Sequence, residues 1–125
     1  MLFGICSHDK DYKFCWMLNQ KLGMDFSKSD SVKIASKKQA AQAEFPVYHF
    51  CEEEIFTDFY IISNKSGTTT LIPEQKKADY FLMIKGNLTQ DEKNDTLKKI
   101  KETQGILTAF EINPEKLKSK QHFQF

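Results

Sequence analysis

Residues 79–112, DYFLMIKGNLTQDEKNDTLKKIKETQGILTAFEI, decide the fold. The run DYFLMIKG is apolar and short, as is typical of a strand, and ILTAFEI is a second run of the same kind. Between them, Thr89 and Glu92 form the signature of a capping box that opens a helix, and Gly105 ends that helix. A strand–helix–strand unit of this length places both strands in one sheet, with the helix on one face.

The other end of the chain begins with a similar pattern. LFGIC (2–6) has the composition of a buried strand, and Ser7 or Asp9 can cap the helix that follows. That helix, DYKFCWMLNQKLG (11–23), carries a wide apolar stripe and ends at Gly23. The stripe consists of Phe14, Cys15, Leu18 and Leu22, with Tyr12 and Trp16 beside it.

The middle of the chain contains two further β-prone runs. FPVYHFCE (45–52) and IFTDFYIISN (55–64) are joined by the acidic tip Glu52-Glu53-Glu54, which indicates a β-hairpin. We interpret the tip as a solvated loop, because three consecutive carboxylates at a turn point in different directions. A turn then leads into a short strand, TTTLI (68–72).

Two segments carry weaker signals. Residues 24–44 are rich in Ser, Lys, Asp, Ala and Gln, and only VKIAS (32–36) suggests a strand, so we interpret 24–44 as a polar connection. Residues 113–125 predict a short turn and a tail, with Asn113 as the N-cap and Pro114 at the first helical position.

These elements predict one α+β domain that spans residues 1–125, because 125 residues is the usual size of a single domain. We expect a mixed sheet, rich in antiparallel pairs, with about five to six strands and two main helices. A strand and helix at one end, a strand–helix–strand unit at the other and a hairpin between them resemble a ferredoxin-like arrangement with an extra strand or two.

Several strands carry apolar residues on both faces. Phe59 and Ile61 alternate with Tyr60 and Ile62, for example. Helices on a single face would leave the other face open, and large open apolar faces usually bind something. We therefore expect a homodimer, with Phe59, Tyr60 and Phe110 as candidate interface residues.

The overall charge names no partner. Lys and Arg number 18 against 17 for Asp and Glu, so no net field attracts nucleic acid or an anionic membrane. No apolar run approaches the roughly 20 residues needed to span a bilayer. The opening MLFGICSH lacks a basic region, so we expect neither a signal peptide nor a membrane anchor.

The three cysteines indicate a reducing compartment. Cys6, Cys15 and Cys51 are an odd number without a C-x-x-C pair, which is typical of free thiols, so we expect a cytoplasmic protein. Cys6 with His8, and His49 with Cys51, would give a zinc-like set if their strands were neighbours. Their spacings match no structural zinc pattern, and we expect no metal and no cofactor.

The stretch LIPEQKKADY (71–80) has the features of a structural corner, and we use that name for it below. Pro73 fixes its own φ and pushes Ile72 into an extended conformation, which ends a strand. Pro73 can also begin a single helical turn, where free N–H groups favour the carboxylate of Glu74.

The end of the corner admits two interpretations. In the structural one, Asp79 accepts hydrogen bonds from backbone donors of the turn and Tyr80 covers it. In the functional one, Glu74 and Asp79 form an acid/base pair with Tyr80 as a donor. The sequence contains no evident nucleophile, metal site or cofactor site that such a pair would serve, so we favour the structural interpretation and expect no catalytic residue.

The corner also resembles the signature of the IPExxVDY family, a group of small bacterial proteins without an established function. The likeness extends along most of the chain, through residues 4–23, 60–66, 71–87 and 106–120. Ala78 stands where the signature has Val. The resemblance implies no activity, and its matching motif positions are Ile72, Pro73, Glu74, Asp79 and Tyr80.

From the sequence we expect a cytoplasmic, non-enzymatic interaction or regulatory module that acts as a homodimer and has an unidentified protein partner. One alternative is an enzyme or small-molecule binder that uses Glu74, Asp79 and Tyr80. A second is an RNA-binding module with an aromatic sheet face, although the Gly-aromatic strand signature is missing. The glycan acceptor patterns at Asn64 and Asn87 carry no meaning in a cytoplasmic chain.

Overall fold

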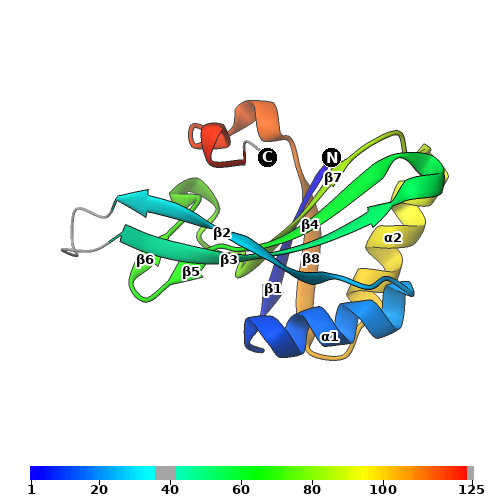
Figure 1. Cartoon of the computed structure of the whole chain (residues 1–125), viewed down its shortest axis with the longest axis horizontal. Helices are drawn as coiled ribbons and strands as arrows, with labels where there is room; N and C mark the ends of the chain where they lie inside the picture. Colours follow the sequence, from blue (N-terminus) through cyan, green and yellow to red (C-terminus); the bar gives the residue numbers. More distant parts are fainter. Residues whose placement is uncertain (36–41, 124–125) are drawn as a thin grey trace.

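A six-stranded sheet organises the computed structural model, which describes residues 1–35 and 42–123 (Figure 1). The strand order is β2-β3-β4-β7-β1-β8, and all neighbouring pairs are antiparallel. The α+β class is confirmed, but the sheet is antiparallel rather than mixed. Its strands, in chain order, are β1 (Leu2–Ser7), β2 (Ser27–Ala35), β3 (Gln42–Glu52), β4 (Thr57–Ser63), β7 (Tyr80–Lys85) and β8 (Ile106–Ile112).

The predicted strand–helix–strand unit is present as β7, α2 (Gln90–Glu102) and β8. Both strands pair antiparallel with β1, so they run parallel to each other with β1 between them. In the same way, β1 and β4 run parallel on either side of β7, and the chain between them passes through α1 (Asp11–Leu22), β2 and β3. These two interleaved units are the ferredoxin-like arrangement, and β2 and β3 are the extra strands beside β4.

The start of α2 follows the local rule in its sequence. The hydroxyl of Thr89 accepts a hydrogen bond from the backbone N–H of Glu92 at 3.1 Å. The Glu92 carboxylate in turn accepts one from the backbone N–H of Thr89 at 3.0 Å. The predicted capping box is therefore confirmed.

The start of α1 differs from the prediction. Its N-cap is Lys10, whose side chain makes no capping hydrogen bond, so the expected caps Ser7 and Asp9 are wrong. The Ser7 hydroxyl instead donates to the carbonyl of Gly105 at 2.9 Å, because β1 ends next to the turn that precedes β8. The helix ends as predicted, with Gly23 in the left-handed conformation at φ 65°.

Much of the predicted polar connection over 24–44 is strand, namely β2 and the beginning of β3. The two strands pair antiparallel, with a shift in register between Ser29 and Val32. An outermost strand exposes much of its surface to water, so its sequence does not need the apolar alternation that reveals a buried strand. The part of this prediction on residues 36–41 lies outside the described residues.

The predicted strand TTTLI is shorter than expected. A separate two-stranded ladder pairs β5 (Lys65–Ser66) with β6 (Thr69–Thr70). Leu71 and Ile72 lie beyond β6 and are fully buried against the sheet. Their apolar character therefore reflects packing rather than strand pairing.

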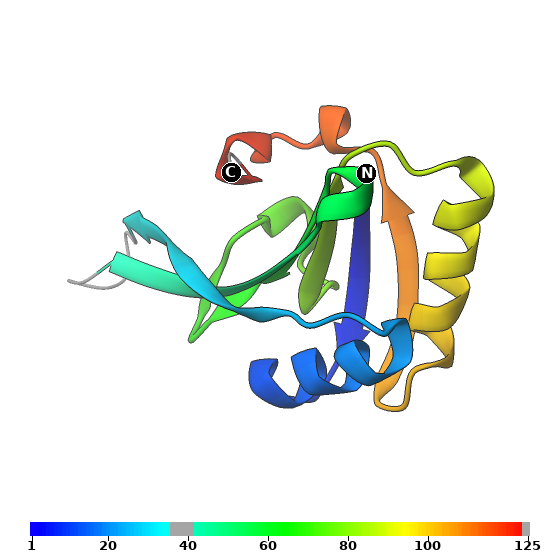
Figure 2. The same ribbon diagram turned by 45° about the vertical axis from the view of Figure 1, so that its right-hand side comes forward.

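The sheet carries an apolar core on each side. Both helices contribute to the first core, which includes Phe14, Leu18, Ile100, Phe3, Ile5 and Leu82. The chain itself covers much of the second face with the corner and with residues 113–123, which we call the tail (Figure 2). The prediction of an open apolar face is therefore wrong for the part of this face that the corner and the tail cover. The covering residues are Leu71, Ile72, Ala78, Leu117 and Phe123. Within the described ranges, neither helix is long and apolar enough to cross a membrane.

Candidate functional site

The corner contains the turn that its proline predicts. Pro73 begins a single 3₁₀ turn, Pro73–Gln75, and the chain enters β7 at Tyr80. The backbone N–H of Gln75 donates to the carbonyl of Ile72 at 3.0 Å, and that of Ala78 donates to Gln75 at the same distance. The corner is thus a sequence of tight turns between two ladders.

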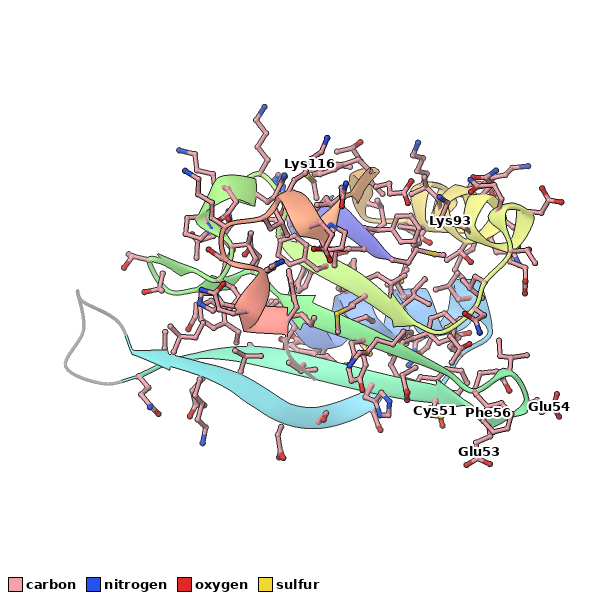
Figure 3. All side chains as sticks on the ribbon, turned by 90° about the horizontal axis from the view of Figure 1, so that it is seen from above. Cys51, Glu53, Glu54, Phe56, Lys93 and Lys116 are labelled. Carbon is pink, nitrogen blue, oxygen red and sulfur yellow. The ribbon has the colours of Figure 1, made fainter. Side chains whose placement is uncertain are left out.

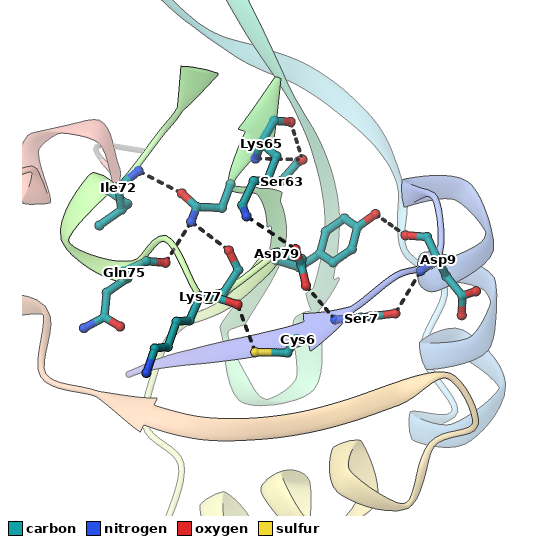
Figure 4. Close-up of polar contacts among 12 residues, drawn as sticks. Cys6, Ser7, Asp9, Ser63, Lys65, Ile72, Gln75, Lys77 and Asp79 are labelled. Atoms are coloured by element: carbon teal, nitrogen blue, oxygen red, sulfur yellow. Dashed lines mark hydrogen bonds and ion pairs between the residues drawn. The ribbon is translucent and has the colours of Figure 1, made fainter. Parts of the chain in front are cut away.

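Asn64, which sequence reasoning missed, holds the corner together (Figure 4). Its amide nitrogen donates to the carbonyls of Gln75 and Ala78, at 3.0 Å and 2.8 Å. Its amide oxygen accepts from the backbone N–H of Ile72 at 2.8 Å. Asn64 is fully buried, and its side chain satisfies three backbone groups, of which those of Ala78 and Ile72 are in buried hydrogen bonds. Its position after an apolar strand, where Asn often organises turns, was the available signal.

Glu74 binds the tail. Its two carboxylate oxygens accept from the backbone N–H of Ser119 at 2.8 Å and from the Ser119 hydroxyl at 3.0 Å. Partial burial opposes ionisation of Glu74, but its own backbone N–H and both groups of Ser119 hold its pKa below the ordinary value. The tail makes a second contact beside this one, where the ring of His122 lies 2.8 Å from the carbonyl of Leu71.

Glu74→Gln is expected to lower the free energy of unfolding at pH 7 by about 0.5–1 kcal/mol, because two charge-assisted hydrogen bonds at an exposed site are replaced by weaker ones. The folded-state pKa of Glu74 is lowered, so this stabilisation is present above the unfolded-state pKa and is lost as pH falls through the folded-state pKa. Urea titrations between about pH 3 and pH 7 test this. An equal difference between the variants at every pH would contradict it.

Asp79 and Tyr80 do not contact the tail; they bind the end of β1 and the residues that follow it. Asp79 accepts from the backbone N–H of Ser7 at 2.9 Å. The Tyr80 hydroxyl donates to the carbonyl of Asp9 at 2.6 Å, and its ring stacks on Phe14 with centroids 4.1 Å apart. Burial, followed by nearby carboxylates, raises the pKa of Tyr80, which keeps the phenol protonated as a donor. These two residues therefore attach the corner to the connection between β1 and α1, whereas Glu74 attaches it to the tail.

A shallow cleft of about 400 Å³ lies beside Asp79 and Tyr80. Lysine and aspartate side chains both line it, including Lys65 and Asp9, together with the ring of His8. Asp79 and Lys65 form an ion pair at 3.7 Å. Asp79 and Tyr80, two of the three residues that the small-molecule alternative names, thus line this cleft, whereas Glu74 does not. All three are engaged in contacts within the chain.

The cysteine and histidine pairs are not brought together. Cys6 and His8 lie at the end of β1, whereas His49 and Cys51 lie on β3, and β7 and β4 separate the two strands. No group of three or more metal-binding side chains is found in residues 1–35 and 42–123.

The thiol of Cys15 is held in its protonated form. Burial, followed by the negative charges of Asp11 and Asp25, raises its pKa to about 11.

The other two thiols are also held in the protonated form. Burial and then Asp79 raise the pKa of Cys6. Desolvation and a hydrogen bond to Asp58 raise the pKa of Cys51. Because the thiolate is the reactive form, these environments make the cysteines weaker nucleophiles than ordinary thiols.

The three candidate interface residues lie in different surroundings. Phe59 belongs to the core beneath the helices and is 3% exposed, so its proposed exposure is wrong. Tyr60 is half-buried on the second face and stacks on the ring of His49, with centroids 4.6 Å apart. Phe110 is also half-buried, and its ring lies over Gly4, where a Cβ atom would come within 2.8 Å of it.

The turn between β3 and β4 presents the most exposed large apolar side chain among the described residues. Phe56 is 89% exposed and Ile55 is 46% exposed. Phe56 also has the only positive φ of a described non-glycine residue, at 49°. We call residues 53–56 the hairpin tip; Figure 3 shows Glu53, Glu54 and Phe56 together at one end of the molecule. The sequence indicated the acidic turn Glu52-Glu53-Glu54. It did not indicate the left-handed backbone of Phe56, because the apolar pattern placed this residue in a strand.

Comparisons with known proteins add no relative: no protein-family model matches the chain, and neither a curated protein nor a solved structure is significantly similar to it.

Proposed function

We propose that this protein is a non-enzymatic interaction module that binds a protein partner through the hairpin tip and acts as a homodimer. The exposure of Phe56 is the main support for binding through the hairpin tip. A large apolar side chain that is 89% exposed gains nothing from the chain's own core. Aromatic residues of this kind supply much of the binding free energy in protein interfaces.

The backbone of Phe56 supports the same proposal. The left-handed conformation costs roughly 1–2 kcal/mol for a residue with a Cβ atom, and glycine avoids this cost. Strained residues of this kind persist where the surrounding structure holds them, and they cluster at functional sites. Here Phe56 ends the 3₁₀ turn Glu53–Ile55, and its backbone N–H donates to the carbonyl of Glu53 at 3.3 Å. The strain at Phe56 is therefore consistent with selection for presentation of its ring.

The side chains of the hairpin tip indicate which chemical groups the partner surface carries. Glu53 and Glu54 are exposed beside Phe56. A complementary surface contains an apolar pocket for the ring and Lys or Arg side chains around it, because opposite charges steer association and exclude wrong partners. The corner has a structural role in this proposal, since its motif residues bind the tail and the connection between β1 and α1.

The cellular compartment and the family of the protein are two further proposals. The three cysteines are unpaired, which supports a role in the reducing cytoplasm. The segments that resemble the IPExxVDY family support membership of that family, with the motif as a corner that closes one face of the sheet.

Phe56→Gly is expected to leave the free energy of unfolding unchanged or to raise it by up to about 1 kcal/mol, because relief of strain offsets the greater entropy of an unfolded glycine. The same variant is expected to lose partner binding. Urea denaturation measures the first effect. A loss of stability above about 1 kcal/mol would show that the Phe56 ring packs within the fold and would contradict the proposal.

Site-specific photocrosslinking tests the binding. A photoreactive phenylalanine analogue is placed at position 56, and at Tyr12 as a matched control, since Tyr12 is an aromatic residue on α1 that is 66% exposed. We expect position 56, but not position 12, to give a discrete adduct in cells, and we expect Glu53→Lys with Glu54→Lys to abolish it. Identical adducts from both positions would overturn the proposed role of the tip.

A further inference from the structure

A cleft of about 380 Å³ lies between the tail, the start of β1 and the end of β7, and we call it the tail cleft. Its apolar lining comes from both the sheet and the tail, and includes Leu2, Met83, Pro114 and Phe123. Its exposed charged residues are Lys85, Lys120 and Glu115. The cleft thus combines apolar side chains with an excess of positive charge, which is the chemistry that the hairpin tip requires of its partner.

The hairpin tip and the tail cleft lie at the same end of the sheet. Lys85 of the cleft pairs in register with Asp58, two residues after Phe56. The side chain of Thr57 packs against Gly86, the residue that follows Lys85. Figures 1 and 2 show the turn between β3 and β4, the N-terminus and the tail at the upper end of the molecule, and Figure 3 looks onto this end. Two identical copies can therefore use both features at once, because a twofold axis brings the tip of each copy to the cleft of the other.

We infer that the hairpin tip of one copy binds the tail cleft of a second copy, with the ring of Phe56 among the apolar side chains of that cleft. A twofold axis repeats the contact, so each copy supplies one tip and one cleft. This inference rests on the proposed function, because it names the partner of the hairpin tip and the interface of the homodimer.

The charges of the tip and the cleft are complementary. Glu53 and Glu54 are exposed beside Phe56, whereas two lysines and one carboxylate line the cleft. Lys120 pairs with Glu115 at 3.2 Å, but both side chains are more than half exposed, and such pairs contribute little to stability. Lys120 therefore loses little when it turns to a carboxylate of the tip. Burial of the Phe56 ring supplies the affinity, and the charges select the partner.

A second cleft, of about 400 Å³, lies between α1 and the end of α2 and suits the tip less well. Trp16 and Met17 give it apolar surface, but its single lysine, Lys21, pairs with Glu102 at 3.5 Å, so its lining has no excess of positive charge. Figure 1 shows α1 and the end of α2 at the lower end of the molecule, away from the turn between β3 and β4. Binding of the tip there would be head-to-tail and would form rings or filaments rather than a twofold dimer.

The interface is expected to be weak, because two tips and two clefts bury less surface than a standard protein interface. We expect a dissociation constant of roughly 10–100 µM. The chain is then largely monomeric at about 1 µM, so urea denaturation of Phe56→Gly at that concentration measures the stability of the fold alone.

Sedimentation equilibrium of the full chain between about 1 µM and about 1 mM tests the dimer. Phe56→Gly is expected to raise the dissociation constant at least about 10-fold, because it removes the inserted ring. Glu53→Lys with Glu54→Lys is expected to do the same by reversing the charges around the ring, and Lys120→Glu by reversing a charge of the cleft. All four residues are exposed, and circular dichroism confirms that the variants are folded.

Lys116→Glu is the matched control for Lys120→Glu. It makes the same charge change at an exposed position of the tail that does not line the cleft (Figure 3). Its dissociation constant is expected to stay within about 3-fold of wild type at physiological salt, because salt screens charges that are not in contact. An equal effect of Lys116→Glu and Lys120→Glu would overturn the role of the cleft.

A charge swap tests which two surfaces meet. The double tip variant and Lys120→Glu are each expected to be poor homodimers, because like charges face each other in both of their contacts. In an equimolar mixture, the basic tip of the first meets the acidic cleft of the second, and the acidic tip of the second meets the basic cleft of the first. The mixed dimer is therefore expected to recover a dissociation constant within about 5-fold of wild type, measured by sedimentation with a fluorescent label on one variant. No gain of the mixture over the separate variants would overturn binding of the tip to this cleft.

The outcomes separate this inference from the proposed function. The photoreactive analogue at position 56 is expected to give an adduct with the mass of two chains, linked to peptides that line the tail cleft. An adduct with a different protein would overturn the inference and leave binding through the hairpin tip intact. A wild-type dimer that neither Phe56→Gly nor Lys120→Glu weakens would overturn the inference and leave the homodimer to another interface. A wild-type chain that stays monomeric up to about 1 mM would overturn the inference and the homodimer together.

Discussion

Replacement of Asn64 with alanine is expected to lower the free energy of unfolding by about 2–5 kcal/mol, because each buried group left unsatisfied costs roughly 1–3 kcal/mol. Two buried backbone groups lose the partner that Asn64 supplies, and a third, partly buried one keeps only the N–H of Ala78. The groups are the carbonyls of Gln75 and Ala78 and the backbone N–H of Ile72. Partial relaxation of the corner keeps the total below the simple sum. Urea denaturation followed by circular dichroism measures the loss.

Asn87 provides the matched control. It also begins a glycan acceptor pattern, but it is exposed, so Asn87→Ala is expected to change the stability by no more than about 0.5 kcal/mol. Asn64→Asp separates the shape of the side chain from its ability to donate hydrogen bonds. The aspartate keeps an acceptor for the N–H of Ile72, but it places a second oxygen, instead of an NH₂ group, against the carbonyls of Gln75 and Ala78. We expect it to be destabilised as well. Equal, small effects of Asn64→Ala and Asn87→Ala would show that the amide does not hold the corner.

The parts of the fold that the sequence revealed depend on local rules. The capping box of α2 involves residues three positions apart, and Gly23 ends α1 through its own backbone freedom. Pro73 begins its turn because its ring fixes φ. The strand–helix–strand unit could be recognised because its apolar runs are separated by clear helix signals.

The parts that were missed depend on contacts between distant segments. The sequence does not show that Glu74 binds Ser119, 45 positions away, or that the tail covers the second face. The open face was expected because both faces of the strands are apolar, and this pattern is the same whether a partner or the chain's own tail covers them. Asn64 and Phe56 were missed for the same reason, since burial and backbone conformation at one residue depend on its surroundings.

Phe123→Ala is expected to lower the free energy of unfolding by about 2–4 kcal/mol, somewhat less than a central core phenylalanine, because the tail can partly reposition. The ring is 9% exposed and packs edge-to-face on Phe81, with centroids 5.2 Å apart and planes at 82°. Its loss leaves a gap above the second face of the sheet. Phe56→Ala is the control, since it removes the same side chain from an exposed site and is expected to change the stability by less than about 1 kcal/mol.

A double-mutant cycle between Phe123→Ala and Glu74→Gln then tests whether the tail is held as one unit. Both residues fasten the same segment, Phe123 through packing and Glu74 through Ser119. If release of one contact frees the other, the combined loss is expected to be smaller than the sum of the single losses by at least about 0.5 kcal/mol. Strict additivity would mean that the two contacts act independently. A Phe123→Ala variant as stable as wild type would mean that the Phe123 ring adds nothing to the second core, and only Leu117 and the corner would then cover that face.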